Sequence, residues 1–309
     1  MPEPIEVSIV VPVYNEEAVI GEFYPRLKQS AEGLGRSYEL VFVDDGSTDG
    51  TFAALLDFKK NDPSLRLVRF TRNFGQQAAV LAGFRHCKGE FIVQIDADLQ
   101  NPPEEIPRLL EAFTGDIELV TTVPRKRRDG ITRVAGSNFL HWFARLLFGR
   151  SVKLNLSSFR AMRRSLIEKI ETCKDRSRYM AVLMSWMGVP SAEVVVDHHN
   201  RSQGETKYSY WNLIQLTWDL ITGFSSAPLR LVTYLGLFGA VMGFLLMMFL
   251  LFQRIVHGIL IEGFVVLSAV FAFFAGVQLL SIGFLGEYLG RVYLQVQDRP
   301  QYIVNKVID

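Results

Sequence analysis

The N-terminal half of the chain alternates short apolar runs with polar turns and segments of helical periodicity. The apolar runs predict strands over 7–13, 39–43, 65–70, 90–95 and 117–123. Near-continuous apolar runs of this length are typical of parallel strands that are buried on both faces of a sheet. Because strands and helical segments alternate, we expect an open, mostly parallel α/β sheet with flanking helices. A ligand crevice is expected along its C-terminal edge.

The C-terminal part has a different pattern, because two long segments carry no charged residue. The segments 231–252 and 263–285 are each long enough to cross a hydrocarbon core of about 30 Å, which takes roughly 20 helical residues. A pair of buried core helices is the alternative explanation. Two such segments joined by a short loop favour a transmembrane hairpin over 228–288.

Basic residues that flank the two spans predict the orientation of the hairpin. Arg230 precedes the first span, and Arg291, Arg299 and Lys306 follow the second. The connecting loop holds only Arg254 and His257 beside Glu262, so a modest bias places the large domain and both termini in the cytoplasm. The first apolar run is too short for a signal peptide and lacks a basic n-region. We therefore expect a multi-pass membrane protein.

Two amphipathic segments lie between the catalytic half and the hairpin. Apolar residues recur at helical spacing over 138–148 and over 210–224, and both segments contain tryptophan. Core packing is the commoner explanation for such stripes. Tryptophan and tyrosine close to a membrane span, however, suit the headgroup layer. We therefore expect both segments to lie at the membrane interface.

These patterns divide the chain into four expected parts, and the sheet is expected to be complete before residue 226. The parts are a cytoplasmic catalytic domain over 1–208 with an interfacial helix near 137–149, an amphipathic interface helix over 209–227, the transmembrane hairpin over 228–288, and a cytoplasmic tail over 289–309. The length of 309 residues suffices for one α/β domain of about 200 residues and this membrane-attached part.

Candidate chemistry is densest after the fourth predicted strand. Asp96 and Asp98 stand one residue apart at the end of that strand, and Gln100 comes two residues later. An Asp-x-Asp pair at a strand end offers hard oxygen ligands to Mg²⁺ or Mn²⁺, ions that a diphosphate typically shares. The alternative is that the carboxylates only cap the helix that Pro102 and Pro103 open. One acid suffices for a cap, so two acids and a carboxamide favour the metal site.

Polar residues after the first two strands are expected to face the same crevice. Asp44 can accept a hydrogen bond from a base imide or a ribose hydroxyl, and Pro12, Tyr14 and Glu16 can form a wall for a planar base. No G-x-G-x-x-G follows the first strand, which weighs against a dinucleotide fold, and no G-x-x-x-x-G-K-[ST] is present, which excludes a P-loop. The glycine-rich, arginine-bearing loop of sugar-1-phosphate nucleotidyltransferases is also missing.

Composition changes this picture little. The net charge of +1 excludes no function class by itself, and we expect no nucleic-acid partner. Cys87 and Cys173 are far apart in sequence and form no metal motif, so we expect both to be reduced and inert in the cytoplasm. Basic residues precede both amphipathic segments. Lys126 and Arg128 among them are expected to form a solvated face, although such a cluster could also bind anionic headgroups.

Three motifs stand at the predicted strand ends: P-x-Y-N-E at 12–16, D-D-G-S-x-D-G-T at 44–51 and D-A-D-L-Q-x-P-P-E at 96–104. Together they resemble those of inverting GT-A glycosyltransferases of family 2, of the dolichyl-phosphate mannose synthase type. Further stretches are similar to the bacterial transferases that attach 4-deoxy-4-formamido-L-arabinose to undecaprenyl phosphate for lipid A modification. These stretches are 72–76, 160–164, 207–209 and 285–291. Bactoprenol glucosyltransferases are near relatives.

The chain departs from the wider family at one position. Many members carry an acidic residue before the Phe159-Arg160 pair, where this chain has Ser158. The departure removes one candidate general base, and it favours the aminoarabinose branch.

The resemblance implies inverting transfer of a sugar from a UDP-sugar to undecaprenyl phosphate at the cytoplasmic face of the bacterial inner membrane, with Mg²⁺ or Mn²⁺ as cofactor. The implied nucleotide-binding residues are Pro12, Tyr14, Asn15, Glu16, Asp44, Asp45, Gln76, Asp96, Ala97 and Asp98. The implied metal ligands are Asp96, Asp98 and Gln100, and the implied phosphate-binding residues are Arg127, Arg133, Arg160, Arg201 and Lys207. The expected catalytic residues are Asp96, Asp98, Arg127 and Arg133. The family also implies a homo-tetramer in contact with the lipid bilayer.

Two functions from other classes are alternatives to polyprenyl-phosphate glycosyl transfer. A processive polysaccharide synthase would share the Asp-x-Asp core, but it should carry Q-x-x-R-W before its channel helices, and this sequence does not. A non-catalytic membrane carrier would have no reason to keep Asp98 and Gln100. The sequence does not identify the sugar, because the residues that contact sugar hydroxyls are scattered over loops.

Overall fold

The structure is a computed structural model of the 309-residue chain. It describes residues 4–125, 157–173, 180–197, 222, 226–257, 263–297 and 299–309. The chain forms two compact units, which are described separately below. One unit holds Met1–Thr206 together with Pro300–Asp309, and the other holds Lys207–Arg299.

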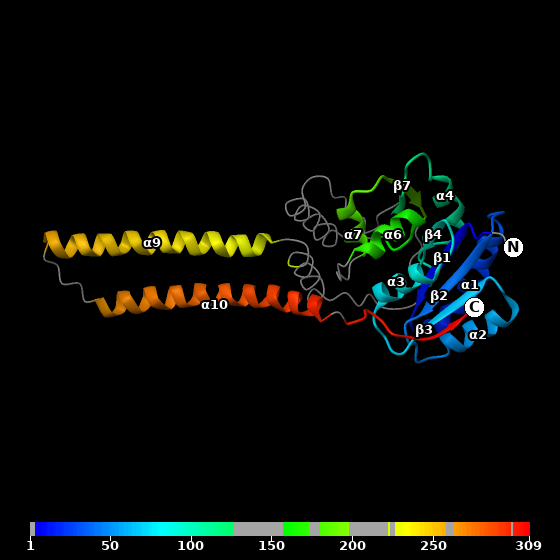
Figure 1. The fold of residues 1–309 in the computed structure, drawn as a ribbon, viewed down its shortest axis with the longest axis horizontal. Helices are drawn as coiled ribbons and strands as arrows, with labels where there is room; N and C mark the ends of the chain where they lie inside the picture. Colours follow the sequence, from blue (N-terminus) through cyan, green and yellow to red (C-terminus); the bar gives the residue numbers. More distant parts are fainter. Residues whose placement is uncertain are drawn as a thin grey trace. The chain divides into compact units, whose positions relative to one another are not determined.

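Within the described residues, an eight-stranded sheet forms the centre of the first unit (Figure 1). Its strands are β1 (Val7–Val13), β2 (Tyr38–Asp44), β3 (Leu65–Phe70), β4 (Phe91–Gln94), β5 (Leu119–Pro124), β6 (Arg160–Arg163), β7 (Ser191–Val196) and β8 (Val304–Ile308). Their order across the sheet is β7-β5-β6-β4-β1-β2-β3-β8. Only β6 and β8 run antiparallel to their neighbours. The predicted GT-A-type, mostly parallel α/β sheet is therefore confirmed.

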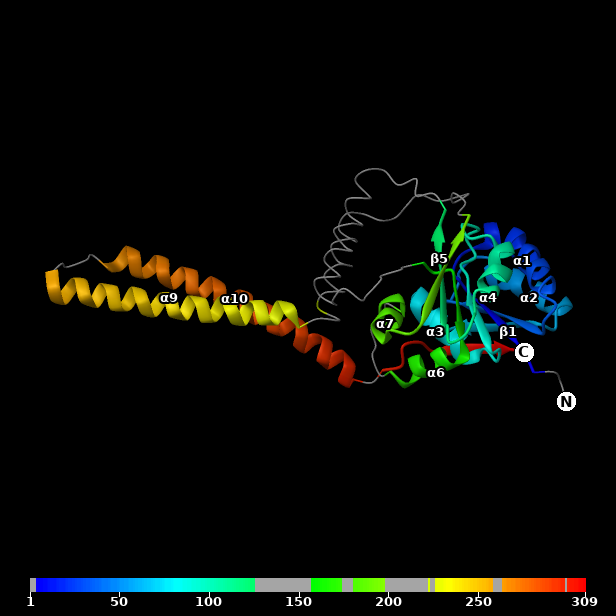
Figure 2. The ribbon, with the colours of Figure 1, turned by 90° about the horizontal axis from the view of Figure 1, so that it is seen from above.

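Helices cover both faces of this sheet. They are α1 (Glu17–Glu32), α2 (Thr51–Asn61), α3 (Gln76–His86), α4 (Ile106–Glu111), α6 (Arg164–Thr172) and α7 (Met180–Met187), with the 3-10 turn η1 (Pro103–Glu105) directly before α4. Residues of α1, α2 and α4 belong to one buried cluster, and residues of α3, α6 and α7 belong to the other. Figure 2 shows α1, α2 and α4 together on one side of the sheet.

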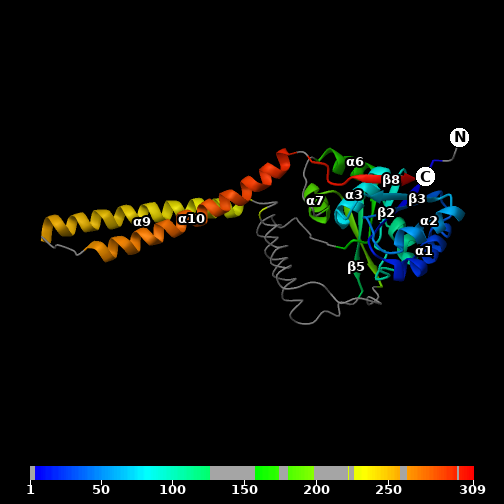
Figure 3. The same cartoon turned by 90° about the horizontal axis from the view of Figure 1, so that it is seen from below.

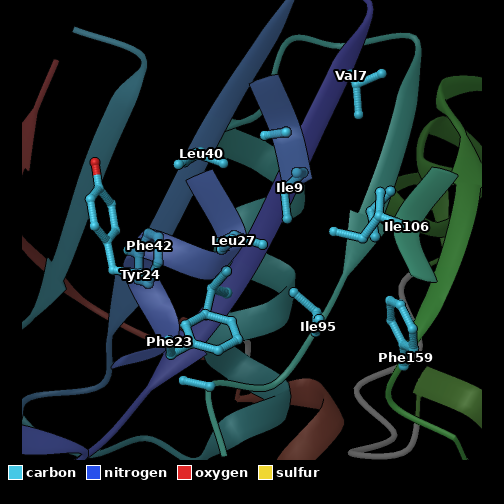
Figure 4. Close-up of a cluster of buried hydrophobic side chains, with 14 of the residues drawn as sticks. Val7, Ile9, Phe23, Tyr24, Leu27, Leu40, Phe42, Ile95, Ile106 and Phe159 are labelled. Carbon is cyan, nitrogen blue, oxygen red and sulfur yellow. The ribbon is translucent and has the colours of Figure 1, made fainter. Parts of the chain in front are cut away.

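The alternation of side chains along β1 explains why two cores form. Val7, Ile9 and Val11 belong to the cluster under α1, whereas Val10 belongs to the cluster under α3. Figure 4 shows Ile9 close to Leu27 in the first cluster. Both faces of β1 are thus apolar, as the period-2 geometry of a doubly covered strand requires.

One glycine allows α3 to lie close to the sheet. A Cβ atom on Gly83 would lie 2.2 Å from Cγ1 of Val10, which is closer than two carbon atoms can approach. A larger residue at position 83 would therefore force Val10 or the helix to shift. Gly83 thus allows α3, whose first residue Gln76 belongs to the candidate site, to pack closely on β1.

The sheet is completed by the last residues of the chain. Strand β8 pairs antiparallel with β3, with Leu67 opposite Ile308, and the N–H of Thr71 donates to the carbonyl of Ile303 at 3.1 Å (Figure 3). The expectation of a complete sheet before residue 226, followed by a separate tail over 289–309, is therefore wrong. The segment was missed because β8 is a short edge strand with an exposed middle, which gives no apolar run.

The second unit contains two long helices, α9 (Ala227–His257) and α10 (Gly263–Val296). Among the described residues, these two are long and apolar enough to cross a membrane, and their apolar windows are unburied in the structure. The ring of Phe274 packs beside Gly239 and Gly243, where a Cβ would lie 3.2 Å and 3.3 Å from ring atoms. Small residues that let helices approach closely are typical of membrane-embedded pairs.

The second candidate span extends further than the sequence predicts. The uncharged segment ends at residue 285, but α10 continues to Val296, and the apolar window covers Phe273–Val296. Glu287 and Arg291 lie one turn apart in this part and form an ion pair of 3.0 Å. Because the two charges pair within the helix, they do not end it.

Candidate functional site

The residues predicted to bind the nucleotide follow strands that end at the same edge of the sheet. Strands β4, β1 and β2 are neighbours, with Val10 paired to Gln94 and Val13 paired to Asp44. The three loops that follow these parallel strands therefore begin side by side. This arrangement brings together the three motifs that the sequence separates by dozens of residues.

The first two loops are bound to each other. The N–H of Asn15 donates to Oγ of Ser47 at 3.0 Å, and Oδ1 of Asn15 accepts from the N–H of Thr48 at 2.9 Å. The N–H of Glu16 donates to Oγ1 of Thr51 at 2.8 Å. Asn15 has φ 54°, a left-handed conformation that asparagine adopts more readily than most residues. Asn15 therefore holds the first two loops together at this edge of the sheet. Its contact with a nucleotide remains a prediction.

The residues predicted to contact a base differ in exposure. Pro12 lies buried in β1, and Ala97 is also buried. Tyr14 is 42% exposed, and Glu16 is half-buried. In the described structure, Tyr14 is thus the member of the predicted wall whose ring is open to a planar ligand.

Asp44 is buried at the end of β2, with an exposure of 1%. Its Oδ1 accepts from the N–H of Ser47 at 3.0 Å, and its Oδ2 lies 3.1 Å from Nε of Arg69. Among the described residues, Oδ2 is the one buried side-chain oxygen or nitrogen that accepts no hydrogen bond, although Arg69 pairs with its charge. Oδ2 of Asp44 therefore keeps a lone pair with which it can accept from a ligand N–H or O–H.

Asp45 anchors the loop before α3. Its two carboxylate oxygens accept from the N–H groups of Phe74 at 2.7 Å and Gly75 at 2.8 Å. Burial raises the pKa of Asp45, and these two donors oppose the rise. The neighbouring Gly46 has φ 70°, and a Cβ there would lie 2.5 Å from the backbone carbon of Arg72. The D-D-G turn and the 72–75 loop therefore form one packed structure that positions the start of α3.

Asp96 is held by side chains from two other elements. Nε2 of Gln76, the first residue of α3, donates to Oδ1 at 2.7 Å, and Oγ of Ser158 donates to Oδ2 at 2.5 Å. Burial raises the pKa of Asp96, and the carboxylate of Asp98 adds to the rise, while Ser158, Gln76 and Arg160 oppose it. The structure thus brings Gln76 and Ser158 to Asp96, and binding of a nucleotide by Gln76, Asp96 and Asp98 remains a prediction.

Asp98 lies on a constrained turn. The N–H of Gln100 donates to Oδ1 of Asp98 at 3.1 Å, and Leu99 between them has φ 59°. A non-glycine residue in this conformation stores backbone strain, which is common at functional sites. In the described part of the chain, no three His, Cys, Asp or Glu side chains could hold a metal. The donor set of Asp96, Asp98 and Gln100 still fits Mg²⁺ or Mn²⁺, because these ions typically take few protein ligands and share substrate phosphates.

Arg160 is buried below Asp96, with an exposure of 3%. Nε donates to Oε1 of Gln94 at 2.9 Å, and Nη1 donates to Sδ of Met184 at 3.4 Å. Burial lowers the pKa of Arg160 to about 10, which Asp96 partly opposes, so the guanidinium remains charged at neutral pH. Its described hydrogen bonds are with the uncharged groups of Gln94 and Met184, and phosphate binding by Arg160 remains a prediction.

The other predicted phosphate-binding residues lie outside the described residues. They are Arg127, Arg133, Arg201 and Lys207. The two amphipathic segments expected at the membrane interface also lie outside them, apart from Thr222. These expectations therefore stay predictions.

Two site residues were not predicted from the sequence. In the sequence, Ser158 stands out only as the replacement of an acid, and Gln94 lies within an apolar run that predicts a strand. Gln94 is buried in β4 opposite Arg160 of β6. A polar residue at a buried strand position signals a buried partner, but the sequence does not reveal which one.

Comparisons with known proteins agree with this geometry. The family model described as Glycosyl transferase family 2 matches residues 8–171. A protein of Pseudomonas paraeruginosa named undecaprenyl-phosphate 4-deoxy-4-formamido-L-arabinose transferase is 40% identical over 311 aligned residues, which cover 99% of this chain and 92% of the relative. The Salmonella paratyphi B protein of the same name is 37% identical, over 98% of this chain and 94% of the relative.

The structural comparison supports the fold. The mannosyl-3-phosphoglycerate synthase of Rubrobacter xylanophilus superposes with a TM-score of 0.52 and 15% sequence identity, over 73% of this chain and 74% of that chain. At this identity the similarity concerns the fold alone. Together with the sequence matches over nearly the whole chain, it establishes that the protein is a glycosyltransferase and belongs to glycosyl transferase family 2.

Proposed function

We propose that the protein transfers a sugar from a UDP-sugar to undecaprenyl phosphate at the cytoplasmic face of the bacterial inner membrane, with inversion at the anomeric carbon. The observation that carries the proposal is the position of Asp96 and Asp98 at the strand edge, with Gln76 and the adjoining loops held around them. The near full-length similarity to undecaprenyl-phosphate sugar transferases supports the choice of acceptor.

The donor would lie across the ends of β4, β1 and β2. Tyr14 offers an exposed side chain to the base, and Oδ2 of Asp44, which pairs with Arg69 but accepts no hydrogen bond, offers an acceptor to its imide or to ribose. Asp96, Asp98 and Gln100 would hold Mg²⁺ or Mn²⁺ at the diphosphate. When bound, this ion would stabilise the charge that develops on the leaving UDP.

The acceptor phosphate needs orientation more than deprotonation. A phosphate monoester is already anionic near pH 7, so its oxygen can attack the anomeric carbon without a general base. The bond to UDP breaks on the opposite face, which inverts the configuration by analogy with inverting glycosidases. Arg127, Arg133, Arg201 and Lys207 would hold the donor and acceptor phosphates, because guanidinium and ammonium groups form charge-assisted contacts with phosphate oxygens. Arg160 would contribute its charge from below.

The transferred sugar is proposed to be 4-deoxy-4-formamido-L-arabinose, for lipid A modification and resistance to antimicrobial peptides. The name shared by the relatives supports this choice. Glucose, the sugar that bactoprenol glucosyltransferases transfer, is the alternative to this sugar. A homo-tetramer remains an expectation from the family.

The strand pairing of β8 supports the proposed topology. Residues 1–206 and 300–309 belong to one sheet-containing unit, which supports a chain that returns to the side of the membrane from which it left. An even number of crossings between residues 206 and 300 is therefore proposed, and two spans fit it. The basic flanks favour the cytoplasmic side for that unit.

A donor screen with the purified full-length protein and undecaprenyl phosphate tests the function. Each radiolabelled UDP-sugar is incubated with the protein and Mn²⁺, and the label in butanol-extractable lipid phosphate is measured. We expect transfer from UDP-4-deoxy-4-formamido-L-arabinose and an acid-labile lipid product. Transfer only from UDP-glucose would replace the sugar but keep the mechanism. Label in a long polymer, or no lipid product from any donor, would refute the proposal.

A further inference from the structure

The two carboxylates of the Asp-x-Asp pair are held in different ways. Each oxygen of Asp96 accepts a hydrogen bond from a side chain of another element, at 2.7 Å from Gln76 and at 2.5 Å from Ser158. The hydrogen bond described for Asp98 comes from its own turn, at 3.1 Å from the N–H of Gln100. Asp96 is thus oriented by long-range contacts, whereas Asp98 depends on local backbone geometry.

Both donors to Asp96 are themselves fixed by the fold. Gln76 begins α3 directly after Gly75, whose N–H is bound by Asp45 at 2.8 Å. Ser158 precedes Phe159, which is fully buried and whose carbonyl accepts from Oγ1 of Thr122 at 2.8 Å. Side chains on such immobilised segments lose little additional entropy when they bind Asp96, so they can set its orientation.

The donors are also uncharged, and this matters beside Asp98. A hydroxyl and a carboxamide can bind the ionised carboxylate of Asp96 without adding another negative charge to the site. A carboxylate at position 158, as many family members carry, would stand within hydrogen-bonding distance of Asp96 and repel it. Serine therefore combines an oriented donor with electrostatic neutrality.

We propose that Ser158, together with Gln76, is a positioning residue that orients Asp96 for divalent-cation binding beside Asp98. This inference rests on the proposed metal-dependent function. Ser158 does not act as a base on the acceptor, because its proton is directed to Oδ2 of Asp96. Each oxygen of Asp96 keeps a further lone pair after accepting one hydrogen bond, so it can also face a cation.

The test measures cation affinity directly, apart from turnover. Mn²⁺ binding to the full-length protein in the presence of UDP is followed by electron paramagnetic resonance, and UDP binding without metal is followed by calorimetry. Ser158→Ala is expected to weaken Mn²⁺ binding about tenfold or more, since it removes a hydrogen bond to a charged group. Ser158→Thr, which keeps the hydroxyl, should restore the affinity to within about threefold of the parent protein. UDP affinity without metal should stay within about twofold in both variants.

Ser157→Ala is the matched control. Ser157 lies next in the chain, and its hydroxyl contacts Thr122 and the carbonyl of Phe159. Its removal should leave Mn²⁺ affinity unchanged. Gln76→Ala provides an independent variant in another element, and it should reproduce the loss seen with Ser158→Ala.

The outcomes separate the inference from the proposed function. If the parent protein binds Mn²⁺ with UDP but Ser158→Ala and Gln76→Ala bind it equally well, the positioning role is refuted and the metal site stands. An equal loss in Ser158→Ala, Ser158→Thr and Ser157→Ala would refute it too, because the effect would then be structural. If the parent protein binds no divalent cation, the metal-dependent function fails first.

Discussion

Tyr302, close to the end of the chain, stacks on Phe70 of β3, with ring centroids 4.9 Å apart and planes inclined by 12°. Nη1 of Arg85 in α3 donates to the hydroxyl of Tyr302 at 3.3 Å. The C-terminal Asp309 forms an ion pair with Arg66 of β3 at 2.5 Å. The end of the chain is therefore an integral part of the catalytic unit, although α9 and α10 separate it from the other strands in the sequence.

This relationship predicts that the last ten residues stabilise the catalytic unit. Tyr302→Ala should lower the free energy of unfolding by about 1–3 kcal/mol, because it removes an aromatic pair and the apolar surface that the ring buries. Thermal unfolding of the detergent-purified protein would show the loss as a lower midpoint. Lys306→Ala in β8 is the matched control, since this side chain is exposed, and its midpoint should not move. An unchanged midpoint in Tyr302→Ala would mean that the stacking of Tyr302 on Phe70 contributes nothing to stability.

The sequence reveals the fold where the apolar pattern is strong. The predicted strands over 7–13, 39–43 and 65–70 match β1, β2 and β3 closely, because strands covered on both faces carry near-continuous apolar runs. Strands β6, β7 and β8 were missed for an equally physical reason. All three are short; β6 and β8 carry basic residues, and β7 is largely exposed along one face.

The site shows the same division between local and long-range information. Asp96 and Asp98 are visible as a motif, because a strand end and two acids are local features. The contact of Ser158 with Asp96 spans 62 positions of sequence and exists only because β6 pairs antiparallel with β4. No spacing rule contains that pairing. Residues that orient a motif are therefore harder to predict than the motif itself.

The second prediction concerns the metal. Asp98→Asn should lower turnover at least about a hundredfold, since a bound cation contributes several kcal/mol of charge stabilisation at the leaving group. Asparagine keeps the oxygen that accepts from Gln100, so the turn should survive and the melting midpoint should stay near that of the parent protein. Initial rates with a UDP-sugar and undecaprenyl phosphate would measure the effect. Treatment with EDTA should silence the parent enzyme, and Mn²⁺ or Mg²⁺ should restore it. Full activity in chelator would disprove metal dependence.

The third prediction concerns Cys87, which is buried at the end of α3. Burial raises the pKa of its thiol to about 11, and the neighbouring Arg164 only partly opposes this rise. At pH 8 the reactive thiolate is then only about one part in a thousand, against about a tenth for an ordinary thiol of pKa 9. Iodoacetamide should therefore label Cys87 slowly in the folded protein and rapidly after unfolding.

A variant with Cys173→Ser leaves Cys87 as the single cysteine, so mass spectrometry of the intact protein reports this thiol alone. The labelling rate of the folded protein should rise with pH across the range from 8 to about 11, because the group loses its proton there. Rapid labelling of the folded protein at pH 8 would contradict the burial of this thiol.

The last prediction separates acceptor binding from donor binding. Arg127 and Arg133 follow β5 in the chain and precede the first amphipathic segment, so we expect them between the nucleotide crevice and the membrane surface. Arg133→Ala, and less strongly Arg127→Ala, should raise the KM for undecaprenyl phosphate while UDP affinity stays within a few-fold. Each guanidinium would make a charge-assisted contact, typically about 1.5–3 kcal/mol, with a phosphate that the UDP complex lacks.

Arg128→Ala is the matched control, because this neighbour is expected on a solvated face and should change neither quantity. Calorimetry with UDP and kinetics with varied lipid phosphate measure the two effects separately. If UDP binding falls in step with transfer, these arginines hold the donor diphosphate, and the acceptor phosphate must be bound elsewhere.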